Sequence, residues 1–591
     1  MFQRLYDLSH FLSSSEQEPW QRINEGMPAE YTVGFALCFS KEGEWQGVET
    51  IYKNEGIVYR SGPSNGTDFT PCCKLASDTA NRLLKVVKKL AGYAKLPENK
   101  KRCLKASIQC FESGKEKIWQ DVETKAKFEA LDKTKRGFVY WVIDSKPVYE
   151  WQEAKAFLQQ QFLIPFAKGG TRIGTCSVCG QQELEVYGNV SIVACYNLDK
   201  PGSIAGGFKD KEAHRNFPVC QNCAFSIAQA FTFAENHLTS SMAGQTYMVL
   251  PYTADEEIYE QLHETIKAHP ERYQLSKTDL VCEEIELVEE FGKQGKQIAL
   301  AVIFFEKKQA SWRLQAEIQQ LLPNRLHELH EAAEKMVQAE DLFGKDDKPL
   351  QISARTFKTF SGTLKKSGKS ELKSAESTLR TWLVALFEKH PIDYKVFLHQ
   401  LVSRMISTGK ADSDKLGWIT RQAWGLYRYA LETQLIKLDN IQGETNMPKA
   451  IPESSYGEYI KEHSEFFHRQ EIVAAFLTGC YASVVAFVQH KKRNATPFTK
   501  KFIGRLLSKE QLQNIYREGH TKLTQYDKLG YVFKKEGKGL DPDLANAWVA
   551  CGEQWNISDE ETTFVFTIGY SLAYRIHQLY SDNDSLEDHL E

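Results

Sequence analysis

Two pairs of cysteines constrain this chain more than any other feature. Cys176 and Cys179 form one C-x2-C pair, and Cys220 and Cys223 form a second. Each pair predicts a tight turn that presents two thiolates, and two such turns can converge on one tetrahedral zinc ion. Gly180 follows the first pair, where such a turn favours a residue that tolerates positive φ. Because four thiolates leave no open coordination position, the pattern predicts a structural zinc and not a catalytic one.

An alternative interpretation is four unrelated buried thiols, but the spacing favours metal. Cys195 and His214 lie between the two pairs and could replace a cysteine in a variant site. We interpret both as bystanders.

The compartment follows from the remaining cysteines and from the apolar runs. The 13 cysteines are an odd number and mostly scattered, which favours metal binding in a reducing cytoplasm over disulfides. The first residues are amphipathic and do not resemble a signal peptide. The longest apolar run, Ile298–Phe305, is too short to span a bilayer, so we expect no membrane partner.

A length of 591 residues predicts several domains in an α+β multidomain fold. We expect an N-terminal α+β domain, an inserted zinc-ribbon-like module, a second α+β segment ending in a basic linker, and an all-α C-terminal helical bundle. Their expected boundaries are 1–170, 171–240, 241–370 and 371–591.

Local patterns place elements within these domains. The N-terminal strands are expected at Tyr31–Phe39, Gly47–Tyr52, Gly56–Arg60 and Phe138–Ile143, and helices at Leu83–Leu90 and Glu150–Phe162. Further strands are expected at Tyr247–Leu250 and Gln297–Glu306, and a helix at Pro323–Val337. The polar stretch Gly344–Lys373 predicts a linker. Helical spacing follows at Thr378–Phe387, Tyr394–Ile406, Trp418–Lys437, Glu471–Gln489 and Thr562–Tyr580.

The sequence gives little support for a catalytic site. Ser367-Gly368-Lys369-Ser370 ends like a phosphate-binding loop, but its earlier glycine has the wrong spacing and no apolar strand precedes it. We therefore reject nucleotide binding there. No His-Glu-x-x-His pattern occurs. Gly62-Pro63-Ser64-Asn65-Gly66 has Gly-x-Ser-x-Gly spacing, and we interpret its polar residues as a plain surface turn. This lowers the expectation of enzymatic activity without excluding it.

Positive charge gathers near the C-terminal end, although the net charge of the chain is only -3. Residues 489–538 hold 13 lysines and arginines against 4 acidic residues, a local net charge of +9. Such cations can follow a phosphate backbone, and interleaved aromatic residues can stack on unpaired bases. The alternative is a solvated face with core aromatics. The candidate nucleic-acid-binding residues are Lys491, Lys492, Arg493, Lys500, Lys501 and Arg505, and the interleaved aromatics are Phe498, Phe502, Tyr516, Tyr526 and Tyr531.

Several blocks around the cysteines resemble one known family. They are Cys176-Ser-Val-Cys179-Gly180, Tyr187-Gly188-Asn189-Val190, Leu198-Asp199-Lys200-Pro201-Gly202 and Asn216-Phe217-Pro218-Val219-Cys220. In order and spacing they resemble the large subunit of the type I-B CRISPR Cascade, the Csh or Cas-eight-b family. Weaker similarity extends through Gly66-Thr67-Asp68 and into the helical C-terminal region.

The resemblance implies an RNA-guided surveillance complex. In such a complex the guide RNA supplies sequence specificity, while the large subunit checks a short motif adjacent to the target DNA, assists strand separation and helps to hold the displaced strand. The implied partners are the guide RNA, double-stranded target DNA, the backbone and small subunits of Cascade, and a separate helicase–nuclease that cuts the DNA. The large subunit itself is expected to lack catalysis.

Two further expectations stand beside this one. The rival function is a metal-dependent enzyme acting on nucleic acid, with carboxylates brought together by the fold. The resemblance also implies that a small subunit can be made by internal initiation, for which Met447 is the favoured start and would give a product of 145 residues.

Overall fold

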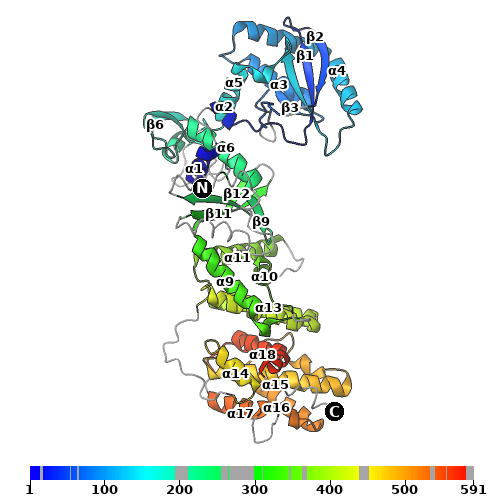
Figure 1. Ribbon diagram of the computed structural model, residues 1–591, viewed down its shortest axis with the longest axis vertical. Coiled ribbons are helices and arrows are strands. Elements are labelled where there is room, and N and C mark those ends of the chain that lie inside the picture. Colours follow the sequence, from blue (N-terminus) through cyan, green and yellow to red (C-terminus); the bar gives the residue numbers. More distant parts are fainter. Residues whose placement is uncertain are drawn as a thin grey trace. The chain divides into compact units, whose positions relative to one another are not determined.

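The computed structural model describes most of the chain (Figure 1). The described residues are 1–12, 17–52, 55–62, 66–168, 170–193, 210–253, 264, 298–308, 311–344, 348–362, 369–437, 452–532, 539–553 and 555–580. Cys195, the Ser367-Gly368 pair and Met447 lie outside these ranges.

Internal contacts divide the chain into two compact units. Unit 1 comprises Met1–Thr239, Thr246–Gln274 and Lys296–Gln319, and unit 2 comprises Ser240–Gln245, Leu275–Gly295 and Gln320–Glu591. The sheets lie toward the N-terminal part of the sequence and the C-terminal region is helical, which confirms the expected α+β fold class. The expected division into four domains stays a prediction.

The first sheet forms the core of unit 1. Its strands have the order β2-β1-β4-β3, with β5 added beside β4. The central strands β1 and β4 are parallel and buried along their whole length, as their uninterrupted apolar sequences predict. Helices α3 and α4 contribute core residues to this sheet. The strands are β1 Val33–Phe39, β2 Trp45–Ile51, β3 Cys72–Lys74, β4 Gly137–Ile143 and β5 Lys146–Pro147, and the helices are α3 Thr79–Ala91 and α4 Glu98–Phe128.

Trp141 of β4 is the centre of this core. It stacks on Phe39 with ring centroids 4.7 Å apart, lies 5.2 Å from the ring of Phe111, and donates its indole N–H to Ser107. The fully buried ring therefore fills the space between sheet and helix while its one polar atom is satisfied.

The predicted strand Gly56–Arg60 is wrong. Ile57, Val58 and Tyr59 are buried, but the segment joins no sheet. Its backbone hydrogen bonds go to loops instead: the Tyr59 N–H donates to the Asn24 side chain, and the Tyr59 carbonyl accepts from Glu25. The strand beside β4, on the side away from β1, is instead β3, Cys72–Lys74, which runs antiparallel to β4.

Unit 1 also contains short helices, a second sheet and most of a third, whose strand β9 falls largely in unit 2. One sheet has the order β6-β7-β8, and the other has the order β12-β11-β10-β9. The expected strands at Tyr247 and Ile298 are confirmed as β10 and β11. The remaining elements up to residue 321 are α1 Phe2–Leu12, α2 Pro19–Arg22, η1 Val148–Glu150, α5 Gln152–Leu163, β6 Thr171–Gly174, β7 Leu184–Tyr187, η3 Asp210–Arg215, β8 Val219–Cys220, α6 Gln221–His237, β9 Thr239–Met242, β10 Gln245–Thr253, β11 Ile298–Lys308 and β12 Ser311–Leu321.

From Pro323 onward the described part of unit 2 is helical. The expected helices are present, with α13 ending at Glu432 instead of Lys437 because Gln434 adopts a left-handed backbone. The elements are α9 Pro323–Gln338, η5 Glu340–Leu342, α10 Ala354–Phe360, α11 Lys369–Glu388, α12 Tyr394–Ala411, η7 Ser413–Lys415, α13 Leu416–Glu432, α14 Ser455–Glu462, α15 Gln470–Arg493, η8 Pro497–Lys501, α16 Lys509–Gln525, η9 Leu529–Tyr531, α17 Leu540–Cys551 and α18 Asp559–Tyr580.

The expected linker Gly344–Lys373 is wrong in part, because it contains α10 and the start of α11. Ser353 forms a capping box with Thr356 at the first residues of α10. Phe357 and Phe360 then recur at helical spacing, and both are buried. A few well-placed apolar residues are thus enough to dock a short helix in an otherwise polar stretch.

Helices α15 and α18 cross at closest range in the bundle (Figure 1). A Cβ added to Gly479 of α15 would lie 2.1 Å from the Phe566 carbonyl oxygen, and one added to Gly569 of α18 would lie 2.1 Å from that of Phe476. The two glycines therefore allow backbone-to-backbone contact.

By length and composition α15 could cross a membrane, but 78% of its most apolar window is buried, which is typical of a core helix.

Candidate metal centre and candidate nucleic-acid interface

Three short strands and one helix hold the four cysteines. Cys176 and Cys179 lie in the turn between β6 and β7, and Cys220 ends β8, which pairs with β7. Cys220 is also the N-cap of α6, so Cys223 falls in the first turn of that helix. The β6–β7 turn thus carries one C-x2-C pair and the β8–α6 junction carries the other, and the two pairs lie side by side.

The sulfur atoms form a compact cluster. All four Sγ atoms lie within 4.8 Å of one another, with Cys179 half-buried and the other three buried. Zinc–sulfur bonds of about 2.3 Å in a tetrahedron place sulfurs about 3.8 Å apart, so small rotations of the side chains would close the cluster on an ion. The four cysteines can therefore hold a metal ion, and their geometry is consistent with zinc.

Backbone hydrogen bonds fix the two turns against each other. The Ser177 N–H donates to the Pro218 carbonyl over 2.8 Å, and the Cys220 N–H donates to Cys176 Sγ over 3.3 Å. The Gly180 N–H donates to the Cys176 carbonyl, and Gly180 has φ of +69°, as expected for a turn of this kind. The ligand positions are thus set by the backbone as well as by the side chains.

The cluster favours a thiolate at Cys176. Hydrogen bonds from the Cys220 and Cys223 thiols hold the pKa of Cys176 well below its ordinary value, against the opposing effect of burial. The N-terminus of α6 lies beside Cys220 and Cys223 and adds a field that favours negative charge. A thiolate is the form of cysteine that binds a metal.

Tyr6 is a neighbour of the cluster that the sequence did not reveal. Helix α1 packs against α6. Burial raises the pKa of Tyr6 to about 12, and negative charge at Cys223 and Cys179 and a hydrogen bond with Cys223 act in the same direction. The Tyr6 ring also meets His10 edge-on at 4.6 Å. The hydroxyl group therefore supports one ligand from outside the cluster.

His214 is not one of the clustered residues. It lies in η3, half-buried, and among the described residues the metal-binding group contains the four cysteines alone. Cys195 lies outside the described residues.

The predicted basic residues lie at the end of α15 and in the segment that follows it. Lys491, Lys492 and Arg493 occupy the last turn of α15, where positive charge complements the helix dipole. Asn494 then ends the helix in a left-handed conformation. Lys500 and Lys501 end η8, and Arg505 follows it. All six side chains are exposed.

Few acidic side chains neutralise these cations. Lys501 pairs with Glu518. Lys491 lies over the Phe487 ring at 5.7 Å, and Arg493 over the Tyr526 ring at 5.3 Å. Within the described part of the chain, Lys501 alone of the six forms an ion pair.

The interleaved aromatics belong largely to the core. Phe498 and Phe502 are 3% and 4% exposed, so they are not free to stack on bases. The Tyr516 hydroxyl donates to Asp541, and Tyr526 is half-buried beneath Arg493. The Tyr531 side chain lies outside the described residues. For the two phenylalanines, the expectation of a stacking platform is wrong because their rings pack beneath the basic segment.

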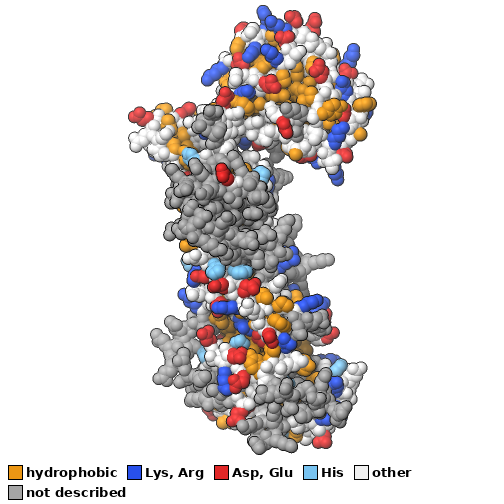
Figure 2. All heavy atoms as spheres, in the orientation of Figure 1, with side chains coloured by type: hydrophobic (Ala, Val, Ile, Leu, Met, Phe, Trp, Pro, Cys, Tyr) orange, Lys and Arg blue, Asp and Glu red, His pale blue; other side chains and the backbone are white. Residues whose placement is uncertain are grey.

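Charge elsewhere on the surface is mixed. Figure 2 shows lysine and arginine side chains interspersed with acidic ones on the visible face. Among the side chains of the described residues on that face, no field of one sign dominates, which agrees with the net charge of -3. Any attraction for nucleic acid must therefore come from local clusters.

Comparison with known families covers nearly the whole chain. Residues 1–160 match the N-terminal domain of the CRISPR-associated protein TM1802, residues 173–321 match its central domain, and residues 356–582 match its C-terminal domain. The central match contains all four clustered cysteines, and the C-terminal match contains the basic segment after α15. No curated protein matches the chain. The three consecutive matches show that this chain belongs to the CRISPR-associated TM1802 family, the large subunits of type I-B CRISPR complexes.

Proposed function

We propose that this chain recognises target DNA within an RNA-guided type I-B complex. In this role it binds the motif adjacent to the target, assists strand separation and holds the DNA strands while the guide RNA reads the sequence. The family match along three consecutive segments carries the proposal. The partners we propose are the guide RNA, target DNA, the Cascade backbone and small subunits, and a separate helicase–nuclease, all in the cytoplasm.

The basic residues after α15 supply the DNA contact in this proposal. Exposed lysine and arginine side chains can neutralise phosphates and release counterions, which gives affinity without sequence information. Lys492, Lys500 and Arg505 are exposed. Their charge is therefore available to a phosphate backbone.

Zinc has a structural role in the proposal. Cys176, Cys179, Cys220 and Cys223 would hold the ion, and four thiolates would fill its coordination sphere. The ion would then tie the β6–β7 turn to the start of α6 and leave catalysis to another subunit.

Reconstitution tests the function directly. The complex is assembled with guide RNA with and without this chain, and its binding to labelled target DNA is measured with the adjacent motif intact or scrambled. We expect tight binding only with the chain present and the motif intact. Equal binding without the chain would contradict the proposal. Cutting of DNA by the purified chain with magnesium or manganese, abolished by changing one carboxylate cluster, would instead support the rival enzyme.

A further inference from the structure

A groove in unit 2 lies between two segments that are distant in sequence. It has a volume of about 630 Å³. One wall comes from the end of α12 and the start of η7, and the other comes from η8 and the residues after it. We propose that this groove binds the phosphodiester backbone of a DNA strand, an inference that rests on the proposed function and places one of its contacts.

The charge of the groove is the first argument. Lys410, Lys500 and Arg505 line it, and its described lining contains no carboxylate. All three side chains are exposed, and none forms an ion pair with a described residue. Three unneutralised cations around one hollow attract an anion with several charges, such as consecutive phosphates.

Two acidic residues flank Ser413 on the α12 side. Asp412 forms a 3.0 Å ion pair with Lys415 and accepts the Asp414 N–H, whereas Asp414 is exposed and forms no ion pair with a described residue. On the other side, Glu518 is held by Lys501. One unpaired carboxylate beside the lining offsets at most one of the three cations, so the groove keeps a net positive charge.

Two glycines bring the walls together. A Cβ added to Gly504, which has φ of +74°, would lie 2.5 Å from Cγ of Lys410. A Cβ added to Gly409 would lie 3.1 Å from the Ile503 side chain. Only small residues allow this approach, and it places Lys410 beside the loop that carries Arg505.

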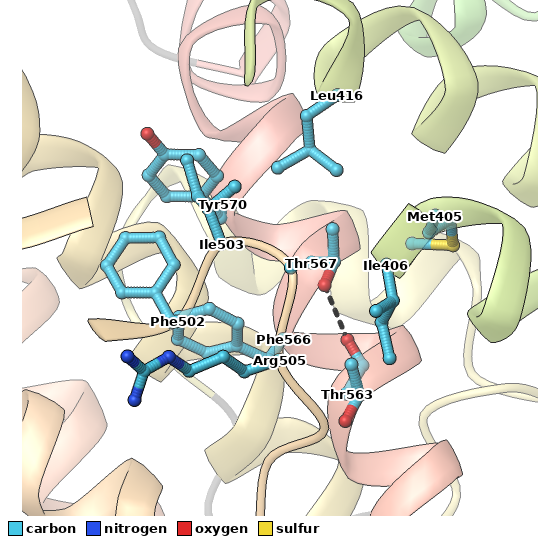
Figure 3. Close-up of a pocket in the computed structure, with 11 residues that line it drawn as sticks. Met405, Ile406, Leu416, Phe502, Ile503, Arg505, Thr563, Phe566, Thr567 and Tyr570 are labelled. Atoms are coloured by element: carbon cyan, nitrogen blue, oxygen red, sulfur yellow. Dashed lines mark hydrogen bonds between the residues drawn. The ribbon is translucent and has the colours of Figure 1, made fainter. Parts of the chain in front are cut away.

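The loop is anchored before any ligand arrives. Figure 3 shows Phe502 against Phe566 and Tyr570, while the Arg505 side chain extends away from Thr563 and Thr567. The ring centroids of Phe502 lie 5.2 Å from Phe566 and 4.9 Å from Tyr570. Beyond the loop, the Leu507 N–H donates to Thr563 Oγ1 over 2.8 Å. Such anchoring reduces the entropy lost when a strand binds.

The side chains that line the groove indicate whether it binds the backbone or the bases of the strand. Besides its cations the groove offers hydroxyl groups, among them Ser413, and small apolar surfaces. It offers no aromatic ring for stacking and no side-chain amide to read a base edge. The groove is therefore suited to the backbone and should bind without sequence preference.

Lys410 gives the sharpest test, because it lies outside the basic segment 489–538. DNA binding by the reconstituted complex is measured for Lys410→Gln and Lys500→Gln over a range of salt concentrations. Loss of one phosphate contact should weaken binding about eightfold at 0.1 M salt and lower the salt slope by about 0.9 on duplex DNA. The loss should be equal for all target sequences.

Lys395→Gln is the matched control, since Lys395 is exposed on the same helix as Lys410, forms no ion pair with a described residue and does not line the groove. It should bind like the unchanged chain, and all three variants should keep the melting temperature. Unchanged affinity and salt slope in Lys410→Gln would overturn the inference. Binding of inorganic phosphate in the groove without any displacement of DNA would also overturn it, because the groove would then be a site for the free anion.

The outcome separates this inference from the proposed function. If neutralising Lys491, Lys492 and Arg493 weakens DNA binding while Lys410→Gln does not, the groove is wrong and the function stands. If the complex with the unchanged chain does not bind target DNA, the proposed function fails.

Discussion

The cysteine cluster and the basic surface use polar side chains in opposite ways. Three of the four cysteines are buried, and backbone hydrogen bonds between their turns fix the sulfur positions. The six basic side chains in the last turn of α15 and the segment after it are exposed. Interactions completed within the chain stabilise its fold, whereas charges left in solvent contribute little to stability and remain available to a partner.

Burial therefore separates a structural site from a binding surface better than residue type does. The same separation holds inside the basic segment, where Phe498 and Phe502 are buried while Lys500 and Arg505 are exposed. If the difference is real, substitutions in the two regions should change different measured quantities.

The largest effect is expected from Cys176→Ser. A structural zinc site can contribute roughly 10–16 kcal/mol to the folding of a small module, comparable to the whole stability of a domain. Loss of one thiolate should lower the zinc content from about one ion per chain and expose the module to protease. Elemental analysis and limited proteolysis measure both effects. Cys110→Ser, on α4 and outside the cluster, is the control. Full zinc content in the Cys176 variant would contradict the account.

A smaller loss of stability is expected from Gly479→Ala in unit 2. The added methyl group would overlap the Phe566 carbonyl oxygen, so α15 and α18 would have to separate. Overpacking of this kind costs about 1–3 kcal/mol, and backbone contact favours the upper end. The midpoint of chemical denaturation should fall. Gly530→Ala, which meets nothing within 4 Å, should leave it unchanged. Equal midpoints for the two variants would show that the helix crossing does not limit the stability of unit 2.

Acid should weaken unit 2 through His463. Burial, followed by the positive charge of Arg428, lowers the pKa of His463 from 6.5 to about 4, although Asp341 and Glu462 act in the opposite direction. The unfolded chain therefore takes up a proton between pH 6.5 and 4 that the folded chain does not, and stability falls as pH drops through this window. The loss is about 3 kcal/mol by pH 4, at about 1.4 kcal/mol per pKa unit.

Replacing the histidine tests this dependence. His463→Gln should flatten the pH profile of stability between pH 6.5 and 4. His390→Gln, at an exposed position, should keep the original profile. If both variants keep the original slope, another group causes the acid sensitivity.

The smallest effect on stability is expected from Tyr6→Phe. The change removes one hydrogen bond to Cys223, worth about 0.5–1.5 kcal/mol. Transfer of zinc to a chelator should become faster, while DNA affinity stays the same. Tyr52→Phe, which loses its bond to Glu129 far from the cysteines in sequence, should not alter zinc transfer. Unchanged transfer in Tyr6→Phe would remove Tyr6 from the support of the cluster.

Features that depend on residues close together in the sequence could be predicted, and features that depend on distant residues could not. The cysteine pairs were recognisable because C-x2-C spacing fixes local geometry, and β1 and β4 because strands buried on both faces are continuously apolar. Gly56–Arg60 is apolar too, but a strand needs a partner that the segment itself does not specify. The helices α4 and α16 are polar, with few apolar residues to mark a buried face, and were not identified.

Tertiary contacts account for what the sequence left hidden at the sites. Tyr6 reaches the cluster from about 170 residues away, because α1 docks on α6. Lys410 joins the groove because Gly409 and Gly504 let two distant segments approach. Neither pairing leaves a local pattern in the sequence.

The salt dependence of target-DNA binding tests the central claim most directly. It is measured for the reconstituted complex with Lys491, Lys492 and Arg493 all changed to Glu, beside the melting temperature of the same chain. The account predicts a salt slope lower by about 0.9 per lost phosphate contact, about 2.7 in all. Stability should fall only by the cost of reversing three charges that complement the dipole of α15, roughly 1–3 kcal/mol, far below the effect of losing the zinc site. An unchanged affinity and slope, or a large loss of stability, would contradict the division between a cluster that holds the fold and a surface that binds DNA.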